Sequence, residues 1–77
     1  MQMTLAFVMI NSVPDQSEWV LERIGEVKGV EEAYRVFGVY DIVAVVKPKT
    51  PEELQGIVLR IRAVRHVKSS LTLVVVK

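Results

Sequence analysis

Apolar residues fall into four stretches that predict β-strands. Residues 3–11 (MTLAFVMIN) and 40–47 (YDIVAVVK) are apolar at almost every position, which is typical of strands buried on both faces. Residues 30–37 (VEEAYRVF) are mixed and charged, as strands at a sheet edge tend to be. Residues 67–76 (VKSSLTLVVV) complete the set, so the pattern predicts four strands.

The segment between the first two strands predicts an amphipathic helix. Pro14 and Asp15 mark its start, because Glu18 follows Asp15 at the spacing of a capping box. Gly29 suits the left-handed conformation that ends many helices. The apolar stripe of this helix consists of Val20, Leu21, Ile24 and Val27.

A second helix repeats the first. Thr50 is placed as its N-cap, with Pro51 at the first helical position. A shift of about 37 residues brings Pro14 onto Pro51 and Gly29 onto His66, and it aligns the two apolar stripes. Two tandem βαβ halves predict one α+β domain over residues 1–77. We expect a ferredoxin-like βαββαβ fold, whose four-stranded antiparallel sheet carries both helices on one face and the first and third strands in its centre.

The other face of this sheet is predicted to be apolar as well. Residues 5–10, 42–46 and 73–76 are apolar at both odd and even positions. An uncovered face of that kind would exceed the few hundred Å² of contiguous apolar surface that soluble monomers usually show. We therefore expect the chain to dimerise through its sheets, most simply about a twofold axis.

Composition narrows the function. The 77 residues are 51% hydrophobic and contain no cysteine, and the apolar runs are too short for a membrane-spanning helix. We expect a cytoplasmic protein without metal or cofactor.

A net charge of +1 argues against a dedicated nucleic-acid binder. The charge is uneven: residues 1–37 hold three Lys/Arg against six Asp/Glu, and residues 38–77 hold seven against three. The two halves are either separate solvated faces or surfaces that attract one another between subunits.

Few residues could support catalysis. His66 is the only histidine and is placed in the turn before the last strand. Glu31 and Glu32 are neighbours on a strand, so their side chains point to opposite faces. No nucleophile with a matching base, phosphate loop or metal-ligand spacing is present in the sequence. We predict that the chain is not an enzyme and has no catalytic residue.

The segment Gly38-Val39-Tyr40-Asp41 is the most informative local feature. One interpretation is structural, with glycine permitting a tight turn and Asp41 accepting hydrogen bonds from turn amides. The other is a small zwitterion site, in which backbone amides near Gly38 hold a carboxylate and Asp41 holds an ammonium group. Three hydroxyl residues at the start of the last strand would add hydrogen bonds: Ser69, Ser70 and Thr72.

These segments resemble the effector domain of Lrp/AsnC regulators, also called the RAM domain. The resemblance covers the whole chain and is most specific at Gly38-Val39-Tyr40-Asp41 and at the hydroxyl-rich last strand. It implies sheet-paired homodimers, higher homo-oligomers such as tetramers of dimers, and amino-acid effectors bound between dimers near the turn before the third strand. It also implies full-length Lrp/AsnC regulators as further partners.

The chain departs from that family in two respects. It begins directly at the first strand, whereas full-length regulators carry an N-terminal helix-turn-helix, so we expect a stand-alone version without direct DNA binding. Arg65-His66 stands where the family often has Pro-Gly. Two alternatives stay open, a small enzyme of the dimeric α+β barrel kind and an ACT-like amino-acid-binding domain, although the glycine expected in the first strand–helix loop of an ACT domain is missing.

Four helix residues do not fit the core pattern. Trp19 and Leu59 lie off the apolar stripes, so we expect both to be exposed or to sit in contacts between dimers. Gly25 and Gly56 each destabilise a helix by about 1 kcal/mol relative to alanine. Their presence suggests close packing at both positions.

Overall fold

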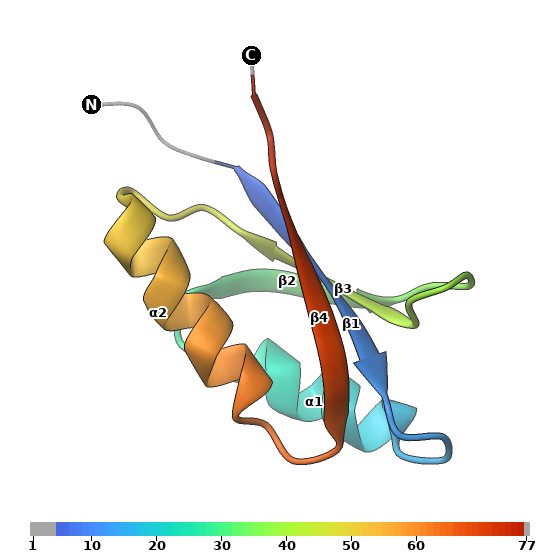
Figure 1. Cartoon of the computed structure of the whole chain (residues 1–77). Helices are drawn as coiled ribbons and strands as arrows, with labels where there is room; N and C mark the ends of the chain where they lie inside the picture. The colour runs from blue at the N-terminus through green and yellow to red at the C-terminus, as the bar shows by residue number, and fades with distance from the viewer. Residues whose placement is uncertain (1–4, 77) are drawn as a thin grey trace.

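The computed structural model describes residues 5–76, which form a sheet covered on one face by two helices (Figure 1). The predicted order of elements, βαββαβ, is confirmed. Their bounds are β1 Ala6–Ser12, α1 Ser17–Gly25, β2 Val30–Arg35, β3 Ile42–Val46, α2 Pro51–Arg62 and β4 Val67–Val74. Within residues 5–76, no helix is long and apolar enough to cross a membrane.

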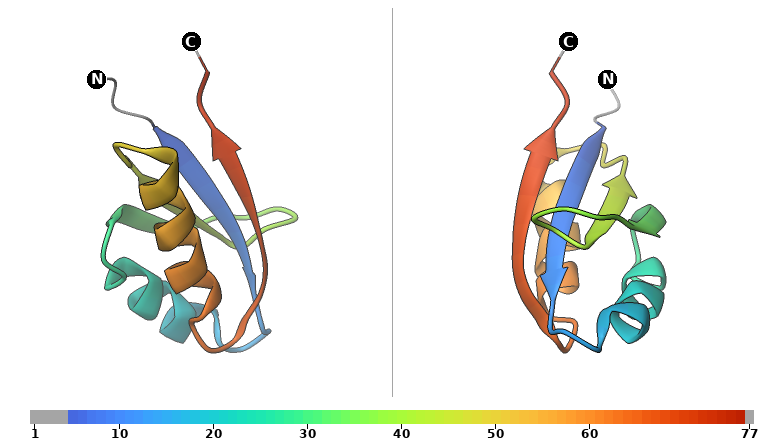
Figure 2. Two further views of the ribbon diagram at one scale, coloured as in Figure 1. Left: turned by 60° about the vertical axis from the view of Figure 1, so that its left-hand side comes forward. Right: turned by 90° about the vertical axis from the view of Figure 1, so that its right-hand side faces the viewer.

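The four strands pair in the order β2-β3-β1-β4, so the first and third strands lie in the centre as predicted. All three pairings are antiparallel. The two further views show both helices on the same side of the sheet (Figure 2). Because α1 and α2 follow equivalent strands, the two βαβ halves place them side by side over one face.

The core lies between this face and the helices. Its ten fully buried residues come from alternate positions of β1 and β3 and from one stripe of each helix. The predicted helix stripes contribute the pairs Val20 and Ile24 from α1, and Ile57 and Ile61 from α2. The strands contribute Ala6, Val8, Ile10, Ile42, Ala44 and Val46.

The start of α1 differs from the expected one. Asp15 has a positive φ of 74°, and Gln16 is the N-cap without a side-chain hydrogen bond, so the predicted capping box at Asp15 and Glu18 is wrong. The amide of Gln16 donates to the carbonyl of Val13 at 3.0 Å. This hydrogen bond closes a turn over Asp15, and the helix therefore begins only at Ser17.

The start of α2 confirms its prediction. The Thr50 hydroxyl accepts from the Glu53 amide at 3.0 Å, and Pro51 occupies the first helical position. The Glu53 carboxylate accepts from the amide of Lys49 at 2.7 Å, one residue before the cap. Both ends of this local motif are set by residues within four positions of one another, which is why sequence alone could predict it.

Candidate functional site

The β2–β3 hairpin extends from the sheet at residues 36–41 (Figures 1 and 2). We expected strands over 30–37 and 40–47, but β2 ends at Arg35 and β3 begins at Ile42, so the connecting loop is longer than predicted. Phe37 and Val39 are almost completely exposed, and Gly38 has a φ of +144°. The tip of the hairpin therefore exposes two apolar side chains and the backbone of Gly38.

Asp41 ties the base of this hairpin to two other elements. Its Oδ1 accepts from the amide of Ser12 at 3.1 Å, and its Oδ2 accepts from the Ser12 and Ser17 hydroxyls at 2.5 and 2.9 Å. Its own amide donates to the carbonyl of Ile10, and its carbonyl accepts from the amide of Val36, both at 3.0 Å. Asp41 thus joins the end of β1, the start of α1 and the start of β3.

The ionised form of Asp41 is favoured by these contacts. Partial burial by itself raises the pKa of the carboxyl, but the hydrogen bonds from Ser12 and Ser17 outweigh it, and the net pKa lies below its ordinary value. A carboxylate has roughly four lone-pair sites, and Ser12 and Ser17 occupy three of them. The backbone amide of Asp41 itself also lowers the pKa. Among the described residues, Oδ1 accepts one hydrogen bond from another residue, the Ser12 amide.

The hydroxyl residues of β4 do not gather on one face. Ser70 and Thr72 pair in register with Ile10 and Val8, which face the helices, and both are half-buried. Ser69 pairs with Asn11 on the opposite face, where the Asn11 Nδ2 donates to the Ser69 hydroxyl at 3.4 Å.

The strand β1 separates these hydroxyls from Asp41, because it pairs with β3 on one side and β4 on the other. At the end of β1, Asn11 contacts Ser69 of β4, and Ser12 contacts Asp41. Sequence reasoning missed them, although a polar Asn-Ser pair ending an apolar strand was a visible signal.

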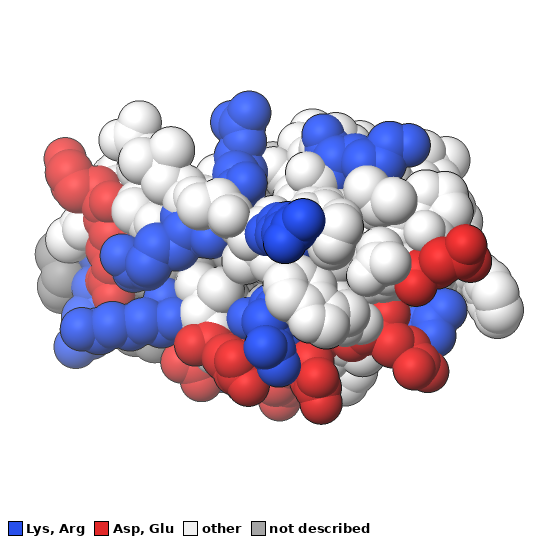
Figure 3. Space-filling view, turned by 90° about the horizontal axis from the view of Figure 1, so that it is seen from below, with Lys and Arg blue, Asp and Glu red and all other residues white. Residues whose placement is uncertain are grey.

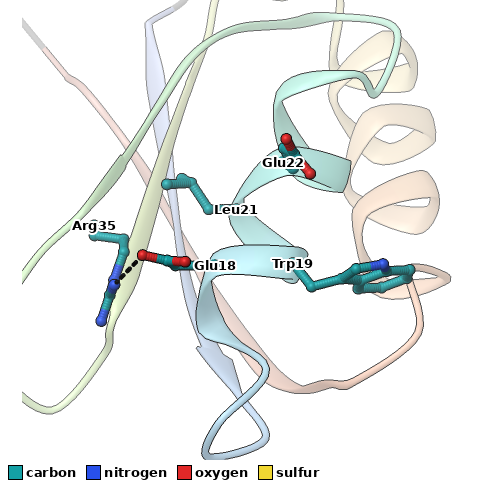
Figure 4. Close-up of a pocket in the computed structure, with 5 residues that line it drawn as sticks. All are labelled: Glu18, Trp19, Leu21, Glu22 and Arg35. Atoms are coloured by element: carbon teal, nitrogen blue, oxygen red, sulfur yellow. Dashed lines mark ion pairs between the residues drawn. The ribbon is translucent and has the colours of Figure 1, made fainter.

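A hollow of about 430 Å³ lies beside α1 (Figure 4). Its two walls are the exposed side of α1 and the end of β2, where Arg35 Nη1 lies 3.6 Å from Glu18 Oε2. A smaller hollow of about 300 Å³ continues from Arg35 toward Phe37 at the hairpin. The residues around the larger hollow are Glu18, Trp19, Leu21, Glu22 and Arg35.

Trp19 packs on the loop before β4. Its ring meets that of His66 edge to face with centroids 5.5 Å apart, and the guanidinium of Arg23 lies 5.2 Å from the Trp19 centroid. His66 has a φ of 74°, and its carbonyl accepts from the amide of Val13. Trp19 is still 39% exposed, in agreement with the expectation of partial exposure.

The sheet face opposite the helices is apolar, as the sequence predicted. Met9 of β1 lies between Val43 of β3 and Leu71 of β4, and Phe7 lies between Val45 and Leu73 in the same way. Leu71 and Leu73 are about half exposed. In the single chain nothing among the described residues covers these side chains, since both helices lie on the other face.

Seen from below, acidic and basic side chains lie next to one another at several places on the surface (Figure 3). The two signs also differ along the chain, because residues 1–37 supply most acidic side chains and residues 38–77 most basic ones. On this side of the molecule, the imbalance between the two halves of the chain does not produce separate surfaces of opposite sign.

Comparison with known proteins decides the family. The Lrp/AsnC ligand binding domain matches residues 5–77, almost the entire chain. The chain belongs to this family. Solved structures agree: TTHA0845 from Thermus thermophilus superposes with a TM-score of 0.91 at 36% identity, covering 97% of this chain and 95% of that protein. AsnC from E. coli superposes with a TM-score of 0.88 at 24% identity, covering 96% of this chain and 51% of that protein, and shows the shared fold.

This chain also matches a short segment of a much larger protein. The homocitrate synthase of Sulfurisphaera tokodaii is 43% identical over 58 residues, which are 75% of this chain and 13% of the enzyme. The family match and the superposed structures confirm the family and the ferredoxin-like fold that the resemblance implied. The matched segment is too small a part of the synthase to attribute its activity to this chain.

Proposed function

We propose that this chain is an amino-acid-binding regulatory module, assembled as a cytoplasmic homo-oligomer. The observation that carries the proposal is the match of the Lrp/AsnC ligand binding domain to residues 5–77. The apolar open face of the sheet supports a homodimer paired through Phe7, Met9 and their neighbours. Such dimers would assemble further into tetramers of dimers. They would also form mixed assemblies with full-length Lrp/AsnC regulators.

The effector site in this proposal centres on the base of the hairpin. Asp41 Oδ1, which accepts from the Ser12 amide, would also accept from the ammonium group of an amino acid, and backbone amides near Gly38 would hold its carboxylate. Val39 and Tyr40 would contact the side chain of the effector. Because the three hydroxyls of β4 lie beyond β1, they would reach this effector only from a neighbouring subunit: Ser69, Ser70 and Thr72.

Calorimetric titration with each of the twenty amino acids tests the site. The wild type should bind one or a few of them, and Asp41→Asn, which keeps the shape and loses the charge, should weaken binding about tenfold. Lys68→Gln changes an exposed charge at the start of β4 and is the matched control, with unchanged binding. Equal affinity in wild type and Asp41→Asn, or no binding at millimolar concentrations, would contradict the proposed site.

The synthase match favours a second role, regulation of a metabolic enzyme. A segment 43% identical to this chain forms 13% of the Sulfurisphaera tokodaii homocitrate synthase. We infer that a domain of this type can make an enzyme responsive to an amino acid. The test adds this chain, with and without the bound amino acid, to that synthase lacking its matching segment. A rate that becomes amino-acid-dependent supports the role, and a rate that never changes contradicts it.

A further inference from the structure

The outer edge of β2 has no strand beside it among the described residues, because β2 stands first in the sheet order and pairs only with β3. In an antiparallel pair, the backbone amide and carbonyl of successive residues point alternately at the partner strand and away from it. The Val36 amide donates to the carbonyl of Asp41 at 3.0 Å, so residue 36 points at β3. By alternation, Arg35 and Ala33 present their backbone amides and carbonyls to the outside of the sheet.

Helix α1 forms a wall beside this edge. It packs against β2, and the hollow of about 430 Å³ lies between the two, with Glu18 and Leu21 pointing from α1 toward β2 (Figure 4). The hollow of about 300 Å³ continues toward Phe37, and Arg35 lines both hollows. We call the two together the α1–β2 groove. A free strand edge beside such a groove is what proteins use to bind an extended peptide as an additional strand.

The charges along the groove are mostly negative. Glu31 and Glu32 of β2 are exposed, and within residues 5–76 neither takes part in an ion pair. Glu18 and Glu22 of α1 each share one arginine, at 3.6 and 3.3 Å. Carboxylates therefore outnumber guanidinium groups here, and an occupant with positive side chains complements them.

We propose that the α1–β2 groove binds an extended basic segment of a partner protein, which adds to the sheet beside β2. The backbone of this segment pairs with the outward amides and carbonyls of Ala33 and Arg35. Every second side chain of the segment then lies in the groove. A lysine or arginine there reaches the glutamates of α1 with its charged end, while its apolar stem packs on Leu21 and Trp19.

A second copy of this chain does not fit the same edge. Two β2 strands paired edge to edge would bring Glu31 and Glu32 of both copies together, and like charges on paired strands are destabilising. The other free edge, β4, carries a single charged residue, Lys68, in eight positions and so offers little complementary charge. A basic segment of another protein remains as the occupant. Its binding goes beyond amino-acid binding and does not depend on it.

A synthetic peptide of seven residues, alternating lysine and threonine with lysine at both ends, tests the groove. Fluorescence reports binding, because Trp19 is the only tryptophan and lines the groove. At low ionic strength the peptide should bind with a dissociation constant below about 1 mM, and the matching peptide with glutamate for lysine should bind at least about tenfold more weakly. Equal binding of the two peptides, or no binding of the lysine peptide, would overturn the proposal.

A pair of charge reversals tests the location. Glu18→Lys should weaken binding of the lysine peptide at least about threefold, because it replaces an attractive charge in the groove by a repulsive one. Glu52→Lys is the matched control, since Glu52 lies in the first turn of α2 as Glu18 lies in that of α1. It changes the net charge equally and should bind like wild type. Equal affinity of the two variants would place the peptide elsewhere and contradict the groove.

Backbone methylation of the lysine peptide tests the added strand. Because successive amides of a strand point to opposite edges, methylating the amides of all lysines or of all threonines blocks one edge only. One of these two peptides should bind at least about tenfold more weakly than the other. Equal affinities would show that charge alone holds the peptide and would overturn strand addition.

Hydrogen exchange locates the paired edge. With the unmethylated peptide bound, the amides of Ala33 and Arg35 should exchange more slowly, whereas that of Tyr34, which points at β3, should not change. Unchanged exchange at both Ala33 and Arg35 would also overturn strand addition.

Discussion

Gly29 lies against Ile57, so closely that a Cβ on residue 29 would stand 2.6 Å from Ile57 Cγ1. Gly29 also has a φ of +102°. The helix α1 already ends at Gly25, and not at Gly29 as the sequence suggested. Gly29, in the turn between α1 and β2, is thus required twice, by its backbone conformation and by the side chain of the second helix. One half of the βαβ repeat is held in contact with the other at this point.

Gly29→Ala should destabilise the protein by about 2–4 kcal/mol, because it adds left-handed strain and a clash with a buried side chain. Urea unfolding measures the loss. A double-mutant cycle with Ile57→Ala isolates the clash, since removing Cγ1 and Cδ1 opens space for the new methyl group. The cost of Gly29→Ala should fall in the Ile57→Ala background, and equal costs in both backgrounds would contradict the packing argument.

His66 occupies the equivalent position in the second half, and its φ of 74° confirms the equivalence in the backbone. His66→Ala should destabilise through loss of the edge-to-face contact with Trp19, by about 0.5–1.5 kcal/mol. His66→Gly should be more stable than His66→Ala by about 1 kcal/mol, because glycine adopts positive φ without strain. Thermal unfolding of the two variants makes the comparison, and an alanine variant as stable as the glycine variant would contradict it.

Asp41 should make stability pH-dependent on the acid side. Its folded pKa lies below the ordinary value of 3.8, so its contribution is fully present above that value and is lost as pH falls through the folded pKa. Asp41→Asn should lower stability near neutral pH by about 1 kcal/mol, with screening taken into account, and should flatten the stability curve in acid. Unfolding free energies measured across the acid range up to neutral pH test this, and parallel curves for both proteins would argue against it.

Met9→Lys should prevent pairing of the sheets. Met9 lies between Val43 and Leu71 on the open face, where a lysine remains hydrated in the single chain but would be buried in a dimer. Light scattering at micromolar concentration should give a monomer, with the helix and sheet content unchanged by circular dichroism. Glu22→Lys alters exposed charge on α1 and serves as the control. A dimeric Met9→Lys variant would mean that the sheets pair elsewhere.

The sequence predicted those features that neighbouring residues specify. Thr50, Pro51 and Glu53 start α2 through contacts within four positions, and the prediction was confirmed. Asp15 and Glu18 carried a similar signal that failed, because a turn closed by the Gln16 amide moved the helix start to Ser17. A capping pattern competes with turn formation, and residue identity alone does not decide which one wins.

Periodicity along the chain was enough to predict the six elements, their order and the two apolar faces of the sheet, because it records which side each residue presents. The surroundings of Asp41 arise only when the chain folds, because its partners Ser12 and Ser17 lie 29 and 24 positions away. The tertiary structure also assigned Ser69 to one face and Ser70 and Thr72 to the other, through the register of β4 on β1. Register comes from long-range pairing, and a shift of one residue would exchange every face.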